Sequence, residues 1–390
     1  MMGSGLTFLD AFFEAISAVT TTGLSTTATM AGKPQSFLFA RAWMQWYGGL
    51  GIVVMALGIM IKPGQAARRL GNMGDYEDDL IGATRSHVRY ILLVYGILTG
   101  MGILLLWILG AGGWNAVLFT LAAVSTGGFS PHDASLKALH GLPVQSAVIF
   151  LSMAGAISFI YYRRPFREGW RVEMNDRQTQ IFLLAALLSA ALLIFFLRNN
   201  NGLDWSQAMR HGILNAFSAQ STAGFSSMDL SRIDAGSKLV LIFSMLSGGC
   251  IGSTAGGIKI LRLIILMRLL YLMILKAGLS PHATIDIKLE GRSLQSDEIQ
   301  NTMSIIILFI LFITLSWFPF VAMGYDPMNS LFEVVSAIGT VGLSSGITSP
   351  DLHPFLKGIL CADMLLGRLE ILVWLVLLTP RNWLGERWEE

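Results

Sequence analysis

The sequence has very little charge. Only 13% of its 390 residues are Asp, Glu, Lys or Arg, against about 25% in ordinary globular chains. Hydrophobic residues make up 53%, and the mean hydropathy is +0.61. Such a composition argues strongly against a soluble enzyme and indicates an integral membrane protein whose outer surface contacts lipid.

A basic excess and clustered metal-binding side chains are also absent. The 27 Lys and Arg residues and 25 Asp and Glu residues leave a net charge of +2, so the chain lacks the positive field that nucleic-acid binding uses. The two cysteines, Cys250 and Cys361, lie far apart, and no two histidines have the i, i+4 spacing of a helical metal site. We expect no nucleic-acid partner, no metal centre and no cofactor.

Long apolar runs predict seven membrane-spanning segments, since crossing a bilayer core of about 30 Å takes about 20 apolar residues. The fifth run is longer than one span and is interrupted by glycines. The runs are Phe37–Ile61, Val88–Leu109, Leu142–Tyr162, Gln178–Leu197, Lys238–Lys276, Thr302–Met323 and Phe355–Thr379.

Four shorter apolar segments predict re-entrant half-helices. Each is too short to cross the bilayer and ends in a stretch rich in threonine and glycine, where irregular backbone must face protein or a water-filled cavity. The segments are Leu6–Thr20, Trp114–Val124, Trp205–Gln220 and Met328–Ile338.

The ends of these segments form an internal repeat, A-x-x-T-x-G-[LF]-S, beginning at Ala18, Ala123, Ala219 and Ala337. The first and fourth copies extend backwards as FEAISA and FEVVSA, which makes a chance similarity improbable. We therefore expect an all-α membrane fold of four pseudo-repeats, each made of a span, a half-helix and a span around a central pore. The expected repeats are residues 1–62, 63–162, 163–277 and 278–390.

Repeat one begins directly at its half-helix, so we expect its first span to be missing. Three explanations stay open: a wrongly assigned start, a truncated chain, or another segment in that position. Lys and Arg gather beside one set of span ends, which predicts a cytoplasmic face there and places the half-helix loops towards the outside.

The repeat motif fits a cation filter. Backbone carbonyls can replace the water shell of a dehydrated cation, and glycine reaches the required backbone angles without a Cβ penalty. We expect the narrow filter at Gly23, Gly128, Gly224 and Gly342. Neighbouring oxygens would come from Thr21, Thr22, Thr126, Gly127, Thr222, Ala223, Thr340 and Val341.

The glycine-rich break in the fifth run predicts a loop that obstructs the cavity below the filter, with a packing kink as the alternative. Arg368 lies inside the last apolar run, where a buried charge points to function. In a cation pore it would act as a barrier; the alternative is an ion pair with Asp363 or Glu370. The expected gate residues are Gly248, Gly249, Gly252, Ser253, Thr254, Gly256, Gly257 and Arg368.

Several motifs make the chain resemble the Trk/Ktr/HKT superfamily of potassium transporters, most closely its bacterial Trk potassium-uptake membrane subunits. They are Phe12–Gly23, Gln45–Ile52, Val124–Ala134, Gly248–Lys259 and Leu366–Glu370. The resemblance implies a K⁺ filter of four glycines and an intramembrane gate loop contacted by Arg368.

The same resemblance implies a homodimer in the cell membrane, bound to a cytoplasmic nucleotide-binding regulatory subunit. The regulatory contact would fall near Arg163–Arg177 and Lys276–Glu298. We therefore predict potassium uptake without covalent chemistry, and not an enzyme. The alternative is an alternating-access secondary transporter that couples Na⁺ or H⁺ to K⁺ symport. An intramembrane hydrolase would need a nucleophile and base within the spans, and the sequence offers no such pair.

Overall fold

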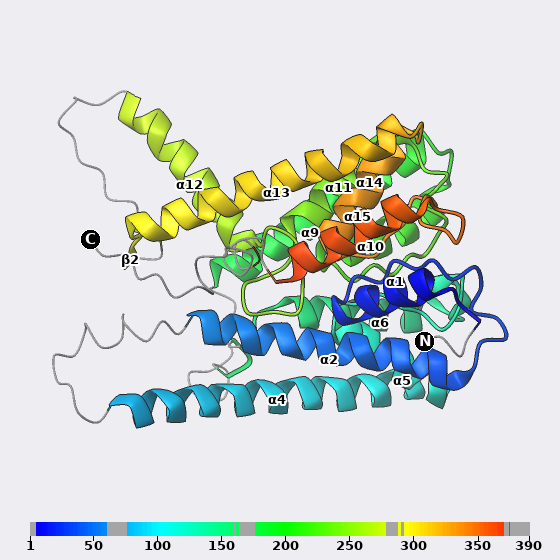
Figure 1. Ribbon diagram of the computed structural model, residues 1–390, viewed down its shortest axis with the longest axis horizontal. Coiled ribbons are helices and arrows are strands. Elements are labelled where there is room, and N and C mark those ends of the chain that lie inside the picture. The colour runs from blue at the N-terminus through cyan, green and yellow to red at the C-terminus, as the bar shows by residue number, and fades with distance from the viewer. Residues whose placement is uncertain are drawn as a thin grey trace.

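The computed structural model describes residues 5–60, 76–159, 161–163, 176–277, 288–289, 292–369 and 374. Most of its helices run along one long axis (Figure 1). Within the described residues, the only strands are β1 (Lys288–Leu289) and β2 (Arg292–Ser293), which form a short antiparallel pair. The prediction of an all-α fold is therefore confirmed, apart from this hairpin.

The four predicted half-helices are present. None has more than 16 residues, so none is long enough to cross a bilayer. Side chains cap three of them at the N-terminus, at Thr7, Asp204 and Asp326, because each side-chain oxygen accepts from a free N–H of the first turn. The half-helices are α1 (Phe8–Val19), α5 (Gly113–Val124), α10 (Trp205–Gln220) and α14 (Pro327–Ile338).

An inner helix follows each half-helix. These are α2 (Gln35–Met60), α6 (Leu142–Ala156), α11 (Ala235–Ser247) and α15 (Pro354–Arg368). Short 3₁₀ turns, η2 (Ser135–Ala138) and η3 (Tyr161–Arg163), flank α6. The predicted run Leu142–Tyr162 was too long for one helix. The chain leaves the helix at Ala156 because the carbonyls of Gly155 and Ala156 accept hydrogen bonds from the loop that follows α11.

Three outer helices are the ones long and apolar enough to span a membrane in the described part of the chain. They are α4 (Tyr76–Ile108), α9 (Arg177–Asn199) and α13 (Ser296–Ala322). The spanning portion of α4 is Val88–Ile108. The fifth predicted run is two helices, α11 and α12 (Ile260–Ala277), separated by the glycine-rich loop. Residues 5–60 contain no counterpart of the outer helices.

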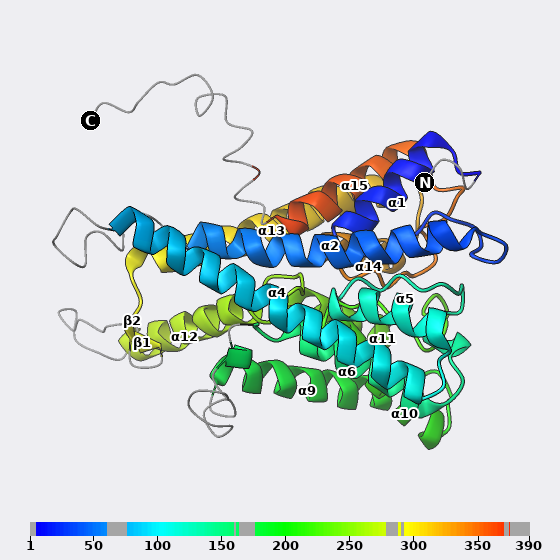
Figure 2. The same cartoon turned by 90° about the horizontal axis from the view of Figure 1, so that it is seen from below.

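Half-helices and inner helices alternate in a closed ring. Each packs against the next in the order α1, α2, α5, α6, α10, α11, α14, α15, and α15 returns to α1. The last contact is visible in both ribbon views, where α15 lies beside α1 (Figures 1 and 2). The outer helices pack on the half-helices of their own repeats, α4 on α5, α9 on α10 and α13 on α14.

Glycines allow the inner helices to approach the half-helix ends. A Cβ at Gly48, Gly155 or Gly367 would collide with a main-chain carbonyl of a half-helix, that of Val19, Val124 or Ile338 respectively. In the third repeat a side chain makes this connection, because Gln220 donates to Ser247 Oγ at 2.9 Å and to the Gly248 carbonyl at 2.8 Å. In the other three repeats the inner helix thus approaches the half-helix directly through its backbone, which only glycine permits.

Candidate ion pathway

All four half-helices end in the same turn. The N–H of each motif threonine and that of the next residue donate back to two carbonyls of the last helical turn; in repeat one, Thr21 N to Ala18 O is 3.0 Å and Thr22 N to Ser17 O is 2.9 Å. This is the Schellman pattern of helix ends. It holds a threonine in the left-handed region, where a side chain usually costs about 1–2 kcal/mol. The φ angles are 53° at Thr21, 52° at Thr126, 53° at Thr222 and 48° at Thr340.

The motif glycines come together in a closed ring. Their φ angles are 94° at Gly23, 76° at Gly128, 73° at Gly224 and 92° at Gly342. In each case an added Cβ would collide with the carbonyl oxygen that precedes the glycine of the next repeat. The pairs are Gly23 with Gly127, Gly128 with Ala223, Gly224 with Val341, and Gly342 with Thr22. We call the oxygens of Thr22, Gly127, Ala223 and Val341 the ring carbonyls.

These contacts run through the four repeats in order and close on themselves. The predicted filter residues, spread over some 320 positions of sequence, therefore meet around one axis. Glycine is required at each motif position for two reasons, the positive φ and the neighbouring carbonyl.

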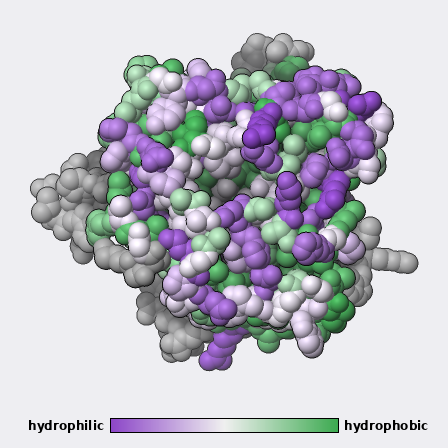
Figure 3. All heavy atoms as spheres, turned by 90° about the vertical axis from the view of Figure 1, so that its right-hand side faces the viewer, coloured by the Kyte–Doolittle hydropathy of each residue, from purple (hydrophilic) through white to green (hydrophobic). Residues whose placement is uncertain are grey.

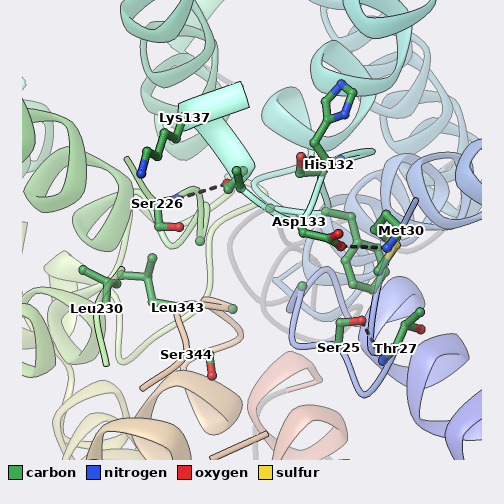
Figure 4. A pocket seen from close by; sticks show the side chains of 18 of the residues that line it. Ser25, Thr27, Met30, His132, Asp133, Lys137, Ser226, Leu230, Leu343 and Ser344 are labelled. Atoms are coloured by element: carbon green, nitrogen blue, oxygen red, sulfur yellow. Dashed lines mark hydrogen bonds between the residues drawn. The ribbon is translucent and has the colours of Figure 1, made fainter. Parts of the chain in front are cut away.

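A polar vestibule lies above the glycine ring. Its volume is about 520 Å³, and Gly23, Gly128, Gly224 and Gly342 all line it. Figure 3 shows this face of the molecule hollowed at its centre, with hydrophilic residues around the opening. The close-up shows Asp133 beside Met30, where its carboxylate accepts from the Met30 N–H at 2.7 Å (Figure 4).

Buried acids hold the loops that follow the filter. Glu14 in α1 accepts from the hydroxyl of Ser25 at 2.5 Å and from Thr26 N at 3.0 Å, and it pairs with Arg41 of α2 at 2.9 Å. In the fourth repeat the equivalent Glu333 accepts from Ser345 N at 2.8 Å. Because both glutamates are fully buried, their carboxylates need these hydrogen-bond donors. The same hydrogen bonds hold the loops that carry the donors in place.

The loop after α11 lies directly against the turns of three repeats, on the side opposite the vestibule. Thr254 Oγ1 donates to the carbonyls of Val124 at 3.1 Å and Gly155 at 2.9 Å. Gly256 N donates to Thr222 Oγ1 at 2.8 Å, and an added Cβ on Gly256 would collide with Gly339 O and Thr340 Oγ1. The loop thus contacts the turns of repeats two, three and four.

Arg368 joins this loop to the first repeat. Its Nη1 donates to the Thr254 carbonyl at 2.7 Å and its Nη2 to the Gly48 carbonyl at 3.3 Å, and only 7% of the residue is exposed. The suggested partner Asp363 accepts instead from Ser316 Oγ at 2.6 Å. The other suggested partner, Glu370, lies outside the described residues.

The expected gate residues are therefore brought together with the expected filter. Gly248, Gly252 and Gly257 have φ of 63°, 76° and 74°, and a Cβ on Gly249 would lie 2.9 Å from the Ala156 carbonyl. Ser253 Oγ donates to the Cys250 carbonyl at 2.6 Å, so its hydroxyl turns the loop rather than lining a pore.

Several buried polar residues of this region were not predicted from the sequence. Gln45, Gln220 and Arg41 are almost fully buried, with exposed fractions of 0%, 0% and 2%. Gln45 and Arg41 contact the filter turns or the loops beyond them, and Gln220 bonds to Ser247 and Gly248 at the end of α11. A signal was present, because a polar side chain inside an apolar run is costly unless it has a purpose. Their neighbours in the sequence are hydrophobic, so the search for apolar runs assigned these residues to helices without marking them as functional.

Comparison with known proteins agrees with this geometry. Residues 1–384 match the TrkH family model, described as a cation transport protein. The Trk system potassium uptake protein TrkH of Salmonella typhimurium is 29% identical over 392 residues, covering 97% of this chain and 80% of the relative. An uncharacterized cation transporter of Methanocaldococcus jannaschii is 28% identical over 370 residues, covering 95% of this chain and 76% of the relative.

The crystal structure of the potassium transporter TrkH from Vibrio parahaemolyticus superposes with a TM-score of 0.85 at 26% identity, covering 97% of this chain and 80% of that one. The resemblance noted from the motifs is thus confirmed. With its spanning helices and a family model that matches nearly its whole length, the chain is a multi-pass membrane protein that belongs to the TrkH family of cation transport proteins.

Proposed function

We propose that this chain takes up K⁺ through a filter formed by the ring carbonyls and the four motif glycines. The observation that carries the proposal is the closed cycle of contacts between each glycine and the carbonyl of the next repeat. Such a ring offers main-chain oxygens from four directions, as an ion without its water shell requires. Relatives named as potassium uptake proteins and a glycine in every repeat support K⁺ as the cargo.

The helix termini support a cation over an anion. Each half-helix ends at the filter turn, so the negative ends of its peptide dipoles, about half an elementary charge each, face the region below the ring. Four such ends lower the energy of a cation there and raise that of an anion.

We propose that the loop 248–257 and Arg368 close this pathway below the filter. The loop contacts the turns of repeats two, three and four, and Arg368 links it to repeat one through the Gly48 carbonyl. A guanidinium beside the axis repels a passing cation. Movement of the loop away from Thr222 and Thr340 would open the cavity.

The division into repeats 1–62, 63–162, 163–277 and 278–390 is part of the same proposal. So are a homodimer and a cytoplasmic nucleotide-binding regulatory subunit, supported by relatives that belong to a named Trk system. The proposed regulatory segments, Arg163–Arg177 and Lys276–Glu298, lie mostly outside the described residues.

A second candidate is alternating access with coupling to Na⁺ or H⁺. The break between α11 and α12 favours it, because broken helices beside the ion path are common in secondary transporters. Single-channel currents from purified protein separate the two, since an alternating-access cycle is too slow to give resolvable unitary currents.

The filter is tested with Gly128→Ser. We expect the K⁺/Na⁺ flux ratio of reconstituted protein to fall several-fold, because the added Cβ collides with the Ala223 carbonyl of the ring. Gly324→Ser is the matched control: its φ is also positive, at 86°, and no atom lies within 4 Å of an added Cβ. An unchanged ratio in Gly128→Ser would reject the filter assignment.

A further inference from the structure

Gln45 of α2 reaches into the filter of the neighbouring repeat. Its side chain is fully buried; its Oε1 accepts from Phe129 N at 3.1 Å, and its Nε2 donates to the carbonyl of Gly127. A backbone N–H can only donate, so contact with Phe129 fixes the amide orientation and leaves the NH₂ group for the carbonyl. One amide thus binds the peptides on both sides of the filter residue Gly128.

The bonded oxygen is one of the four ring carbonyls. Gly127 is the only glycine among the residues that carry them; the other repeats have Thr22, Ala223 and Val341. Repeat two therefore has two successive glycines, Gly127 and Gly128, in the segment that forms its part of the filter. Two successive glycines restrain the backbone less than any other pair of residues. Gly127 N donates to the Ala122 carbonyl, but among the described residues only Gln45 bonds to the peptide between Gly127 and Gly128, which carries the ring carbonyl.

Gln45 and Gly127 fit each other sterically. A Cβ on Gly127 would lie 2.6 Å from Oε1 and 2.8 Å from Nε2 of Gln45. The amide therefore occupies the space that a side chain would take at Gly127. The Gln45 side chain of α2 thus fills the space left by the absent side chain of Gly127.

The other inner helices carry different residues at the equivalent position, three before the glycine that aligns with Gly48. They are Ser152, Met245 and Met364, all fully buried. The Ser152 hydroxyl donates to Val148 in its own helix. In the described part of the chain, an amide reaches a ring carbonyl from this position only in the first inner helix.

We propose that Gln45 is a positioning residue for ion selectivity, which holds the Gly127 carbonyl at its place in the ring. This rests on the proposed K⁺ filter. Without the amide, the backbone at Gly127 and Gly128 can rotate so that the Gly127 carbonyl points away from the ion. The ring then loses one ligand and no longer has a fixed size. A looser ring discriminates less between K⁺ and the smaller Na⁺.

The experiment uses a cycle of variants in reconstituted protein, with K⁺ and Na⁺ fluxes as the readout. Gln45→Ser should lower the K⁺/Na⁺ ratio about fivefold, the factor that corresponds to one net hydrogen bond. Gly127→Ala should lower it too, since its Cβ collides with Gln45. The double variant Gln45→Ser/Gly127→Ala reproduces the Ser152 and Ala223 combination and should recover most of the ratio.

Gln35→Ser, at an exposed position of the same helix, is the control and should keep the wild-type ratio. Should Gln45→Ser fail to give folded protein, Gln45→Met with Gly127→Val carries the same test, matching Met245 and Val341. A wild-type ratio in folded Gln45→Ser or Gln45→Met, or a double variant no better than the singles, overturns the role of Gln45. A wild-type protein without K⁺ preference instead overturns the proposed function.

Discussion

Thr254 and Arg368 together connect the loop 248–257, the proposed gate loop, to the repeats around it. Thr254 donates from its hydroxyl to repeat two and accepts at its carbonyl from Arg368. Both are buried, and a buried guanidinium needs acceptors for its N–H groups. Among the described residues, Arg368 donates to main-chain carbonyls and not to a carboxylate, so no described side chain neutralises its positive charge.

Arg368→Ala should raise K⁺ flux severalfold, because it removes both that charge and a bond that holds the loop. Rubidium or potassium flux into vesicles measures this. Arg268→Ala, at an exposed position of α12, should leave flux unchanged. A flux in Arg368→Ala equal to or below that of the wild type contradicts the barrier role.

Helix ends are where sequence and structure differ most. The half-helices agree closely: α1 covers Phe8–Val19 within the expected Leu6–Thr20, and α14 adds one residue to the expected start. Their ends are encoded locally, by an N-cap, an apolar face and the threonine–glycine turn. The end of α6 is not, because apolar residues continue past Ala156 and the helix stops where the loop after α11 bonds to the Gly155 and Ala156 carbonyls.

The candidate site was predictable to a similar extent. The residues proposed for the filter and the gate follow from repetition and from glycines in an apolar run, both visible in one sequence. Gln45 and Gly127 stand 82 residues apart, in different repeats and without any shared pattern. Such long-range polar contacts depend on which helices become neighbours, and periodicity alone does not contain that information.

Gly367→Ala tests the close approach of an inner helix to a half-helix. We expect a lower midpoint of thermal unfolding in detergent and reduced transport, since the added Cβ collides with the Ile338 carbonyl beside the filter turn. Overpacking of this kind costs about 1–3 kcal/mol.

Gly358→Ala lies on the same helix with open space around it. It should keep or raise stability, because alanine favours a helix by about 1 kcal/mol over glycine. Equal stability of the two variants would argue against direct backbone packing at Gly367.

Over the whole molecule, polar contacts join each repeat to the next. Lys238 of repeat three bonds to Asn329 of repeat four at 2.6 Å, and Gln145 of repeat two accepts from Arg210 of repeat three at 2.9 Å. Lys357 of repeat four pairs with Asp10 of repeat one at 2.6 Å. This last pair joins positions 347 residues apart and closes the ring between its first and last repeats.

Lys357→Met should lower the free energy of unfolding by about 3 kcal/mol, because it leaves the Asp10 carboxylate buried without its partner. The double variant Asp10→Asn/Lys357→Met should lose less, since no unpaired charge remains. Thermal and denaturant unfolding in detergent measure both.

Arg232→Met breaks a surface pair whose side chains are 87% and 59% exposed, so a loss below about 1 kcal/mol is expected. If Asp10→Asn/Lys357→Met is less stable than Lys357→Met alone, the charges of this pair do not govern the stability of the contact between repeats one and four.

Because each motif glycine contacts the carbonyl of the next repeat, the four parts of this ion pathway can change separately in evolution. In an assembly of four identical subunits, any change in the sequence is made at four places at once. Here a change alters one quadrant, and its effect passes first to the single neighbour whose oxygen faces the altered glycine. The sequence of each repeat can therefore diverge separately, as the hydrogen bond from the Gln45 amide of repeat one to Gly127 of repeat two illustrates.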